Sequence, residues 1–314
     1  MPPAPQTLTL DDAAIDAAAT LIRAGQPVAV PTETVYGLAA DATSGEAVAR
    51  IFAAKGRPSF NPLIVHIANL AEAEMLVELS PVARRLADAF WPGPLTLVLP
   101  LLEGAPVAGL VTAGLSTLAV RMPAHPAMRA LIIASGRPLA APSANASGKI
   151  SATRASHVAA SLGERVPMIL DGGATRLGLE STIVAVAEDQ LRLLRPGPID
   201  AAALEMASGL PVTTVHDGTI EAPGQLSSHY APAKPLRLDA VDRRDGEWLI
   251  GFGAIAGDDT LSARGDLVEA AARLFDALHR TESVQASGIA VAPIPHEGLG
   301  IAINDRLARA AAPR

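Results

Sequence analysis

The chain has 314 residues, a formal net charge of −7 and no cysteine. This length allows two domains, the absence of cysteine excludes disulfides, thiol nucleophiles and thiolate metal sites, and the acidic balance argues against broad, nonspecific binding to nucleic acids. No uncharged run reaches the ~18–20 apolar residues that span a bilayer. The N-terminal segment lacks the basic and apolar regions of a signal peptide. We therefore expect a soluble, cytoplasmic protein without a membrane partner.

The first predicted elements lead into a polar loop. Asp11 and Asp12 open an alanine-rich helix that ends near Gly25, and Val28–Val30 reads as a short buried strand. Residues 31–38, PTETVYGL, follow this strand and carry two threonine hydroxyls, a carboxylate and a phenol. Ligands of α/β proteins bind beyond the carboxyl ends of strands. The loop is therefore a candidate binding element, although an N-cap threonine would explain part of the pattern.

A basic turn follows the next predicted helix. Ser44 caps that helix, which ends in Lys55-Gly56-Arg57. Such a turn suits a phosphate or carboxylate, because a guanidinium grips two oxygens while an ammonium supplies a point charge. The helix dipole also favours a lysine at this end, so a structural role for Lys55 stays open. Residues 63–67 form the next predicted strand, in which His66 would ordinarily be a hydrogen-bonded sheet residue.

The middle of the chain alternates between helical and strand patterns. Helices are predicted after Ser80, from Pro126 and after Thr153, which would cap its helix. Strands are predicted at residues 95–99, 118–121, 139–141, 168–170, 180–184 and 190–194. Such alternation, with some adjacent strand pairs, indicates a mixed, twisted α/β sheet. Arg121 ends an apolar strand and must meet an anion or stay hydrated, because burying an unpaired charge is costly. The Ser143-Ala144-Asn145 turn offers a hydroxyl and an amide to phosphate oxygens.

The pattern weakens between about residues 207 and 233, which we interpret as a linker. This segment carries His229-Tyr230 between two proline-containing turns, and loops of this length tend to be functional. Beyond it, strands at residues 248–253 and 289–292, a helix at 266–279 and a last helix after Asn304 indicate a small α/β domain.

Eight segments occur in this order along the chain: PTETVYGL, KGRPSFNPLIVHI, WPGPLT, STLAVRMPAHP, APSANASG, LESTIV, LLRPGPI and PGQLSSHYAP. Together they resemble the YrdC-like family, and specifically the long, two-domain form of the threonylcarbamoyl-AMP synthases. The resemblance is dense between residues 28 and 198 and thinner beyond residue 232. It implies a YrdC-like twisted mixed sheet with flanking helices in a catalytic domain of residues 1–206. A linker or lid at 207–234 and a smaller Rossmann-like α/β domain at 235–314 would follow.

The resemblance implies ATP-dependent synthesis of L-threonylcarbamoyl-AMP from L-threonine and bicarbonate or CO₂, with release of pyrophosphate. Threonine's amine would capture the carbon as a carbamate, and a carbamate oxygen would attack the α-phosphorus of ATP. Mg²⁺ would accompany ATP, held mainly by phosphates and water, because no dedicated carboxylate cage is evident and no protein metal site is predicted. Downstream proteins would transfer the threonylcarbamoyl group to tRNA, so we expect no strong direct nucleic-acid binding by this chain.

The same resemblance assigns site residues by motif position. The threonine side would comprise Thr34, His66, Arg121, Ala141 and Ser181, with Arg121 binding the carboxylate. The ATP side would comprise Arg57, Asn61, Thr117, Ser143, Asn145, Ser151, Arg195 and Tyr230. Lys55 and Arg57 are the expected catalytic residues, which would neutralise phosphate charge. Whether Glu33 is structural or assists proton removal from the amine stays open.

Two other functions fit parts of the pattern. A concave basic patch could make the protein an RNA-binding module without catalysis, but the acidic balance and the lack of interleaved aromatic and basic residues argue against this. A carbamoyltransferase would depend on carbamoyl phosphate rather than threonine. Cysteine-rich zinc fingers accompany the related domain in hydrogenase-maturation carbamoyltransferases, and this chain has no cysteine.

Overall fold

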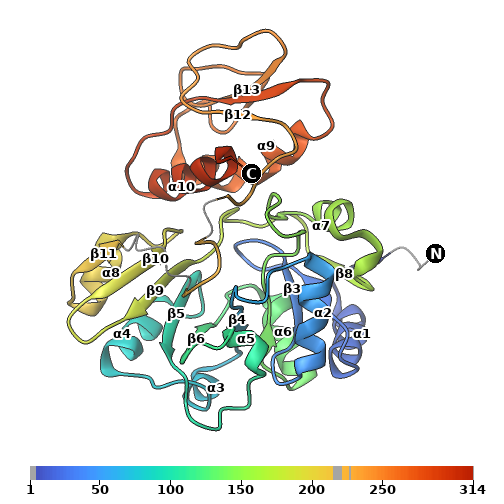
Figure 1. Cartoon of the computed structure of the whole chain (residues 1–314), viewed down its shortest axis with the longest axis vertical. Coiled ribbons are helices and arrows are strands. Elements are labelled where there is room, and N and C mark those ends of the chain that lie inside the picture. The colour runs from blue at the N-terminus through green and yellow to red at the C-terminus, as the bar shows by residue number, and fades with distance from the viewer. Residues whose placement is uncertain (1–4, 215–220, 226–227, 314) are drawn as a thin grey trace.

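Two β-sheets, each with its own helices, organise the molecule (Figure 1). The computed structural model describes residues 5–214, 221–225 and 228–313, so Leu226 and Ser227 of the predicted linker motif lie outside the described residues. We call the 11-stranded sheet with α1–α8 the large unit, and the four-stranded sheet with α9 and α10 the small unit. None of the helices in the described part of the chain has the length and apolar content needed to cross a membrane.

The large unit is a mixed sheet with helices packed along it. Its strands follow the spatial order β1-β8-β2-β3-β7-β4-β6-β5-β9-β10-β11, in parallel and antiparallel pairs, which confirms the predicted fold class. The strands are β1 (Gln6–Thr9), β2 (Val28–Val30), β3 (Gly37–Asp41), β4 (Ile64–His66), β5 (Leu95–Pro100), β6 (Thr117–Arg121), β7 (Leu139–Ala140), β8 (Met168–Asp171), β9 (Thr182–Val186), β10 (Leu191–Arg195) and β11 (Val212–Thr214). The helices are α1 (Asp12–Arg23), α2 (Gly45–Lys55), α3 (Leu70–Glu74), α4 (Pro81–Phe90), α5 (Gly109–Thr112), α6 (Pro126–Ser135), α7 (Ala155–Leu162) and α8 (Ala201–Ser208), with a 3₁₀ turn at Gly163–Arg165.

Short-range sequence signals predict the ends of several helices correctly. The Ser44 hydroxyl accepts a hydrogen bond from the Ala47 amide at the start of α2. The same helix ends at Gly56, whose φ of 62° is a left-handed conformation that glycine adopts without strain. Ser80 caps α4, and Pro81 occupies its first turn. These boundaries depend on short-range hydrogen bonds, which is why the sequence alone predicts them.

Two predictions about the elements are wrong. Thr153 does not cap α7, because the helix begins at Ala155 and the Thr153 hydroxyl lies 3.3 Å from Nδ1 of His157 instead. The last helix starts before Asn304, at Leu299, from a glycine-containing turn that offers no side-chain cap as a signal. The segment interpreted as a linker also contains one short strand, since Val212–Thr214 pairs in parallel with β10 at the edge of the sheet; its role as a linker stays a prediction.

The small unit is a parallel sheet with two helices. Its strands β12 (Leu236–Arg237), β13 (Glu247–Gly251), β14 (Asp259–Thr260) and β15 (Gly288–Val291) follow the order β12-β15-β13-β14, and every pair is parallel. Helices α9 (Leu267–Thr281) and α10 (Leu299–Ala311) lie on the side of this sheet that faces the large unit (Figure 1).

The two units share one buried apolar cluster. Val35, Ile150 and Leu179 of the large unit belong to one buried cluster with Phe275 of α9 and other residues of the small unit. The rings of His157 on α7 and His279 on α9 stack beside it, with centroids 3.8 Å apart. Burial of apolar surface is the main stabilising contribution in such an interface, so the small unit is docked firmly rather than tethered loosely.

The backbone of the large unit lies against α9 at Gly178, which makes this glycine a test of docking. An alanine Cβ there would lie 2.4 Å from the Ala271 carbonyl oxygen, and the residue has a φ of +70°. We expect Gly178→Ala to displace α9 and to lower the free energy of unfolding by about 1–3 kcal/mol through strain and overpacking. Calorimetry and hydrogen exchange of the α9 amides would measure both effects.

Gly209→Ala is the matched control. Gly209 has a similar φ of +74°, but a Cβ there would meet nothing within 4 Å. It should therefore show only the backbone cost, and α9 should exchange as in the wild-type protein. Equal destabilisation by the two substitutions, with equal exchange in α9, would contradict the docking role of Gly178.

Candidate active site

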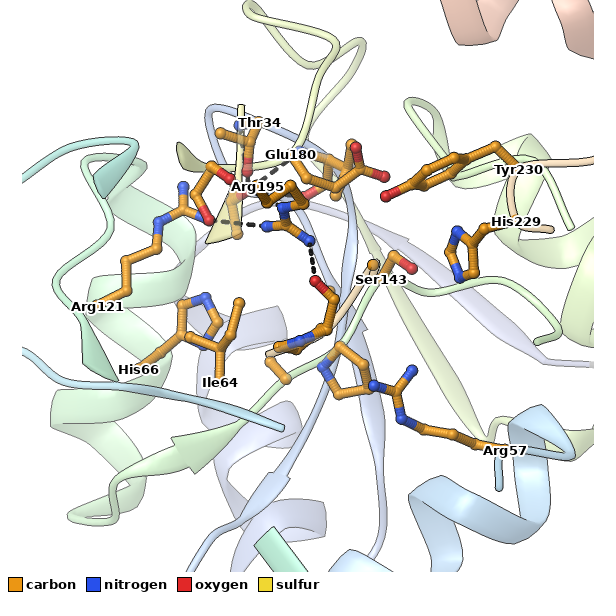
Figure 2. Close-up of a pocket in the computed structure, with 18 residues that line it drawn as sticks. Thr34, Arg57, Ile64, His66, Arg121, Ser143, Glu180, Arg195, His229 and Tyr230 are labelled. Atoms are coloured by element: carbon orange, nitrogen blue, oxygen red, sulfur yellow. Dashed lines mark hydrogen bonds between the residues drawn. The ribbon is translucent and has the colours of Figure 1, made fainter. Parts of the chain in front are cut away.

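A polar cavity lies where the ends of strands from the large unit meet the linker (Figure 2). Its free volume is about 40 Å³, which is room for a few water molecules. Nine of the fourteen predicted site residues line it: Thr34, Arg57, His66, Arg121, Ala141, Ser143, Ser181, Arg195 and Tyr230. Figure 2 shows Arg121 and His66 on one side, Arg57, His229 and Tyr230 on the opposite side, and Arg195 between them.

Arg121 is held in place by a buried carboxylate. It lies opposite His66 in the parallel pairing of β6 with β4. Its Nη2 donates to Oε1 of Glu33 at 2.5 Å, and its Nε donates to the Gly93 carbonyl oxygen at 3.2 Å. The remaining terminal nitrogen makes no hydrogen bond within the described residues. Arg121 therefore presents part of its guanidinium to an anion in the cavity.

Glu33 is a positioning residue for Arg121 rather than a base. Burial raises the pKa of Glu33, but the charge and hydrogen bond of Arg121, with backbone hydrogen bonds, outweigh burial and lower the pKa to about 2. Its second oxygen accepts from the amides of Ala124 at 3.1 Å and His125 at 3.2 Å. A carboxylate with so low a pKa accepts protons poorly at neutral pH. This geometry favours the structural role of Glu33, which stays a prediction.

The threonine pair of the first loop presents an acceptor to the cavity. The Thr32 hydroxyl donates its proton to the Val35 carbonyl oxygen at 2.6 Å. The hydroxyls of Thr32 and Thr34 are 2.8 Å apart, so Thr34 must donate in that hydrogen bond. The free lone pairs of Thr34 then suit an amine. Thr32 lines the cavity and was not predicted as a site residue, because its role depends on this local network.

Arg57 and Arg195 are two further cations at the cavity. Carbonyl and side-chain oxygens of Asn61 and Pro62 hold Arg57, and carbonyl and hydroxyl oxygens of Ser181 and Pro223 hold Arg195. Burial, and then the positive charge of Arg195, lowers the pKa of Arg57 to about 10. Burial is also the main cause that lowers the pKa of Arg195. Two such cations without an ion pair to a carboxylate in the described chain favour a polyanion.

Several buried polar atoms around the cavity have no hydrogen-bond partner within the described residues. They include Nδ1 of His66, Nδ1 of His229 and the hydroxyl of Tyr230. Burial lowers the pKa of both histidines to about 3, so both rings are neutral at pH 7, and burial raises the pKa of Tyr230 to about 12. Buried polar groups are normally paired. Their concentration here marks a surface suited to a polar ligand.

The other five predicted residues do not line the cavity: Lys55, Asn61, Thr117, Asn145 and Ser151. Asn61 supports Arg57 directly, Asn145 hydrogen-bonds backbone carbonyls within its own turn, and Thr117 pairs with Pro100 in the sheet. The Ser151 hydroxyl donates to Glu180.

Lys55 is buried, and its ammonium donates to the carbonyl oxygens of Ser143 and Asn145. Burial, and then the charge of Arg57, lowers the pKa of Lys55 well below its usual value. In this geometry Lys55 fixes the Ser143–Asn145 turn. Direct contact of Lys55 with phosphates stays a prediction.

Sequence reasoning missed Glu180 as a site residue. Glu180 lines the cavity and is buried, and burial raises its pKa while the charges of Arg306 and Arg195 outweigh burial and lower it. The only signal in the sequence was a charged residue at the start of the apolar LESTIV segment. Within the described ranges, no group of three or more histidine, cysteine, aspartate or glutamate side chains is placed to hold a metal ion.

Comparisons with known proteins agree over the whole chain. A family model described as "Telomere recombination" matches residues 20–197, and one described as "Threonylcarbamoyl-AMP synthase, C-terminal domain" matches residues 199–312. A Bacillus subtilis protein named threonylcarbamoyl-AMP synthase is 42% identical, over 98% of this chain and 95% of its own length.

Solved structures show the same similarity. A crystal structure of P. abyssi Sua5 complexed with L-threonine superimposes with a TM-score of 0.89 and 39% identity, over 97% of this chain and 96% of that chain. The E. coli YciO structure, at 21% identity and a TM-score of 0.57 over 64% of this chain and 99% of that chain, shares the fold.

The Glu33–Arg121 pair predicts a measurable loss of stability when one partner is neutralised. Glu33→Gln leaves the Arg121 charge buried without a carboxylate, which should lower the free energy of unfolding by about 3–5 kcal/mol. Denaturant unfolding would measure the loss. Glu46→Gln is a suitable control, because it removes the exposed ion pair of Glu46 with Arg50 and should cost less than about 1 kcal/mol. If Glu33→Gln and Glu46→Gln had the same free energy of unfolding, the buried Glu33–Arg121 pair would not be needed for stability.

The buried histidines predict that the protein becomes less stable as the pH is lowered from neutral. The folded pKa of His66 and His229 is about 3, whereas the unfolded value is about 6.5. The unfolded chain therefore binds more protons below pH 6.5, and the stabilising contribution is lost progressively between pH 6.5 and 3. Calorimetry at pH 7.5 and 5.0 should show a lower melting temperature at pH 5.0. Each of these two histidines should contribute on the order of 2 kcal/mol to the loss. An unchanged melting temperature would contradict the neutral, buried state of these rings.

Proposed function

The chain belongs to the threonylcarbamoyl-AMP synthase family, and from this premise we propose that it makes L-threonylcarbamoyl-AMP from L-threonine, bicarbonate or CO₂, and ATP, releasing pyrophosphate. The observation that carries the proposal is that the two sides of the cavity differ in chemistry. One side offers Arg121 and the acceptor hydroxyl of Thr34, which suit the carboxylate and amine of an amino acid. The other offers Arg57 and Ser143, with Arg195 between the sides, which suits phosphates (Figure 2).

The proposed reaction needs positioning and charge stabilisation rather than a protein nucleophile. The threonine amine attacks the carbon of CO₂ and loses a proton, which gives a carbamate. A carbamate oxygen then attacks the α-phosphorus, and the bond to the leaving pyrophosphate breaks. Negative charge develops on the phosphoryl oxygens during this transfer. Arg57 and Arg195 supply positive charge in a cavity where water is scarce, and fixed charges act strongly in such surroundings.

The remaining roles follow the two sides of the cavity. We propose that His66, Ala141 and Ser181 complete the threonine side. On the ATP side, Ser143 and Tyr230 lie at the cavity, while Asn61, Asn145, Ser151 and Thr117 are proposed from their position in the motifs. Lys55 would act through the turn that it holds, or directly on phosphates after that turn moves. The chain would deliver its product to separate proteins that modify tRNA.

Mg²⁺ is proposed to arrive bound to the phosphates of ATP. Glu180 is the one carboxylate among the described cavity-lining residues, and both of its oxygens accept hydrogen bonds, from Ser151 and Arg306. The donor set therefore suits a metal held by phosphate oxygens and water, and not one held by protein carboxylates. When bound, the metal would neutralise phosphate charge alongside Arg57.

The linker is proposed to be a movable cover. Pro223, Gly224, His229 and Tyr230 line the cavity, whose free volume of about 40 Å³ is far below the ~300–1,000 Å³ of ordinary ligand pockets. ATP therefore requires the linker to withdraw and then to close over it. Closure would protect the product, because a carbamoyl-adenylate is a mixed anhydride that water hydrolyses. We propose the limits 1–206, 207–234 and 235–314 for the catalytic domain, this cover and the small domain, and a cytoplasmic location.

Turnover with single substrates omitted tests the function. Purified protein should release pyrophosphate and form a product with the mass of threonylcarbamoyl-AMP when ATP, bicarbonate and L-threonine are all present. Omitting threonine or bicarbonate should abolish this product. No product under any combination, from folded protein, would contradict the proposal, and salt-sensitive RNA binding without turnover would favour the RNA-binding alternative. Dependence on carbamoyl phosphate would favour a carbamoyltransferase.

Two arginine variants should separate the sides of the cavity. Arg121→Ala should raise KM for threonine by about 10–100-fold, because it removes charge-assisted hydrogen bonds. Arg57→Ala should lower kcat with ATP by about 100-fold or more, because its charge acts on the transferred phosphoryl group. Arg137→Ala, which removes a half-exposed arginine paired with Asp41, is the control and should leave both values unchanged. If Arg121→Ala and Arg57→Ala had identical kinetic effects, the assignment of Arg121 to the threonine side and Arg57 to the ATP side would be wrong.

A further inference from the structure

We propose that Arg306, on α10 of the small unit, is a positioning residue for the nucleotide side of the cavity, through which docking of the small unit completes the site. This inference rests on the proposed function, and it gives the small unit a role in that reaction. The contacts that carry it run from Arg306 to Glu180 and to Tyr230, which both line the cavity.

The first contact neutralises the carboxylate at the cavity. The side chain of Arg306 is 0% exposed, and its Nε donates to Oε2 of Glu180 at 2.9 Å, across 126 residues of sequence. The other Glu180 oxygen accepts from Ser151, a residue proposed for the ATP side. A carboxylate here would repel phosphates unless a cation balanced it. Arg306, which also pairs with Asp305 at 2.7 Å, supplies that cation, and Arg57 and Arg195 stay available to an anionic ligand. Asp305 has a second partner in Arg309.

The second contact holds the linker closed. The Arg306 guanidinium carbon lies 5.4 Å from the centre of the Tyr230 ring, within the range of a cation–π interaction. Phe275 of α9 packs on the same ring with centroids 5.5 Å apart. The neighbouring His229 amide donates to the Arg309 carbonyl oxygen on α10 at 3.2 Å. Both helices of the small unit therefore contact the linker at the point where it covers the cavity.

Tyr230 has a strained backbone that these contacts maintain. Its φ is 61°, in the left-handed region that residues with a side chain rarely adopt. Such conformations cost roughly 1–3 kcal/mol and persist where the surroundings determine them. The surroundings of Tyr230 are Arg306, Phe275 and His229. When α10 undocks, Tyr230 loses its support and Glu180 loses its counter-ion in one movement.

The experiment compares nucleotide binding with threonine binding in the full-length chain. Calorimetric titration with a non-hydrolysable ATP analogue, and separately with L-threonine, gives both dissociation constants without turnover. Arg306→Met should weaken binding of the analogue at least tenfold, because Glu180 is left as an unpaired negative charge at the phosphate side. Threonine binding should change less than threefold, because Arg121 and Thr34 keep their partners. A folded Arg306→Met variant that binds the analogue as tightly as the wild type overturns the inference.

A double variant separates charge neutralisation from simple loss of packing. Glu180→Gln combined with Arg306→Met removes both charges, so it should recover at least threefold of the lost affinity for the analogue. Arg306→Lys keeps the positive charge and should lose less affinity for the analogue than Arg306→Met. It is the variant to measure if Arg306→Met does not fold. If the double variant binds the analogue no better than Arg306→Met, the inferred role of the Glu180 contact is wrong.

Arg237→Met is the matched control within the small unit. Arg237 makes two hydrogen bonds to Glu247, at 2.9 and 2.5 Å, away from the cavity. It should alter the melting temperature without altering either dissociation constant. A tenfold loss of analogue binding in this control would overturn a specific role for Arg306. A wild-type chain that binds neither ligand would overturn the proposed function, whereas unchanged binding by the Arg306 variants overturns the present inference alone.

Discussion

Buried arginine charge is the constraint on which the site depends. Four guanidinium groups surround the cavity or its covering linker; those of Arg121, Arg195 and Arg306 are buried and that of Arg57 is partly buried, and the buried charges require compensation. The chain supplies one buried carboxylate to Arg121 and another to Arg306. It gives Arg57 and Arg195 carbonyl, amide and hydroxyl oxygens, which orient the guanidinium groups without neutralising them. The uncompensated charge is therefore concentrated on the side where phosphates are proposed to bind.

The composition of the chain does not reveal this local distribution of charge. The whole chain carries a formal charge of −7, yet its cavity is cationic because distant segments contribute one arginine each. β6 and β10 end at Arg121 and Arg195, and Arg57 follows the end of α2. A net negative charge discourages nonspecific binding to polyanions. A single anionic ligand can still be recognised where the fold gathers these few cations.

The sequence predicted what short-range physics determines. Serine caps, a left-handed glycine and strands such as Val28–Val30 were located correctly, because their signals lie within a few residues. Elements of two residues, such as β12 and β14, are too short for a periodic pattern. Motif resemblance supplied the site residues, and nine of them meet at one cavity. It could not supply the pairing of Glu180 with Arg306, because a contact across 126 residues is set by how the two units dock. Nor could it show that Lys55 points at backbone carbonyls, since that depends on the tertiary position of the Ser143–Asn145 turn.

The closed geometry also constrains how the enzyme works. The free volume of the cavity is about 40 Å³ with Tyr230 in place, so the proposed binding of ATP requires the linker to move first. The linker is attached to both helices of the small unit. Tyr230 contacts Phe275 of α9 and Arg306 of α10, and the His229 amide donates to the Arg309 carbonyl oxygen on α10. Opening the linker therefore breaks contacts with the small unit or carries that unit along, and in both cases part of the docking free energy opposes it. Returning to the closed state recovers that free energy, and the Tyr230 hydroxyl and His229 Nδ1, which have no partner among the described residues, would be available to the proposed nucleotide. A docked second unit would thus help the proposed cover to exclude water from an unstable product, through interactions that the large unit alone does not contain.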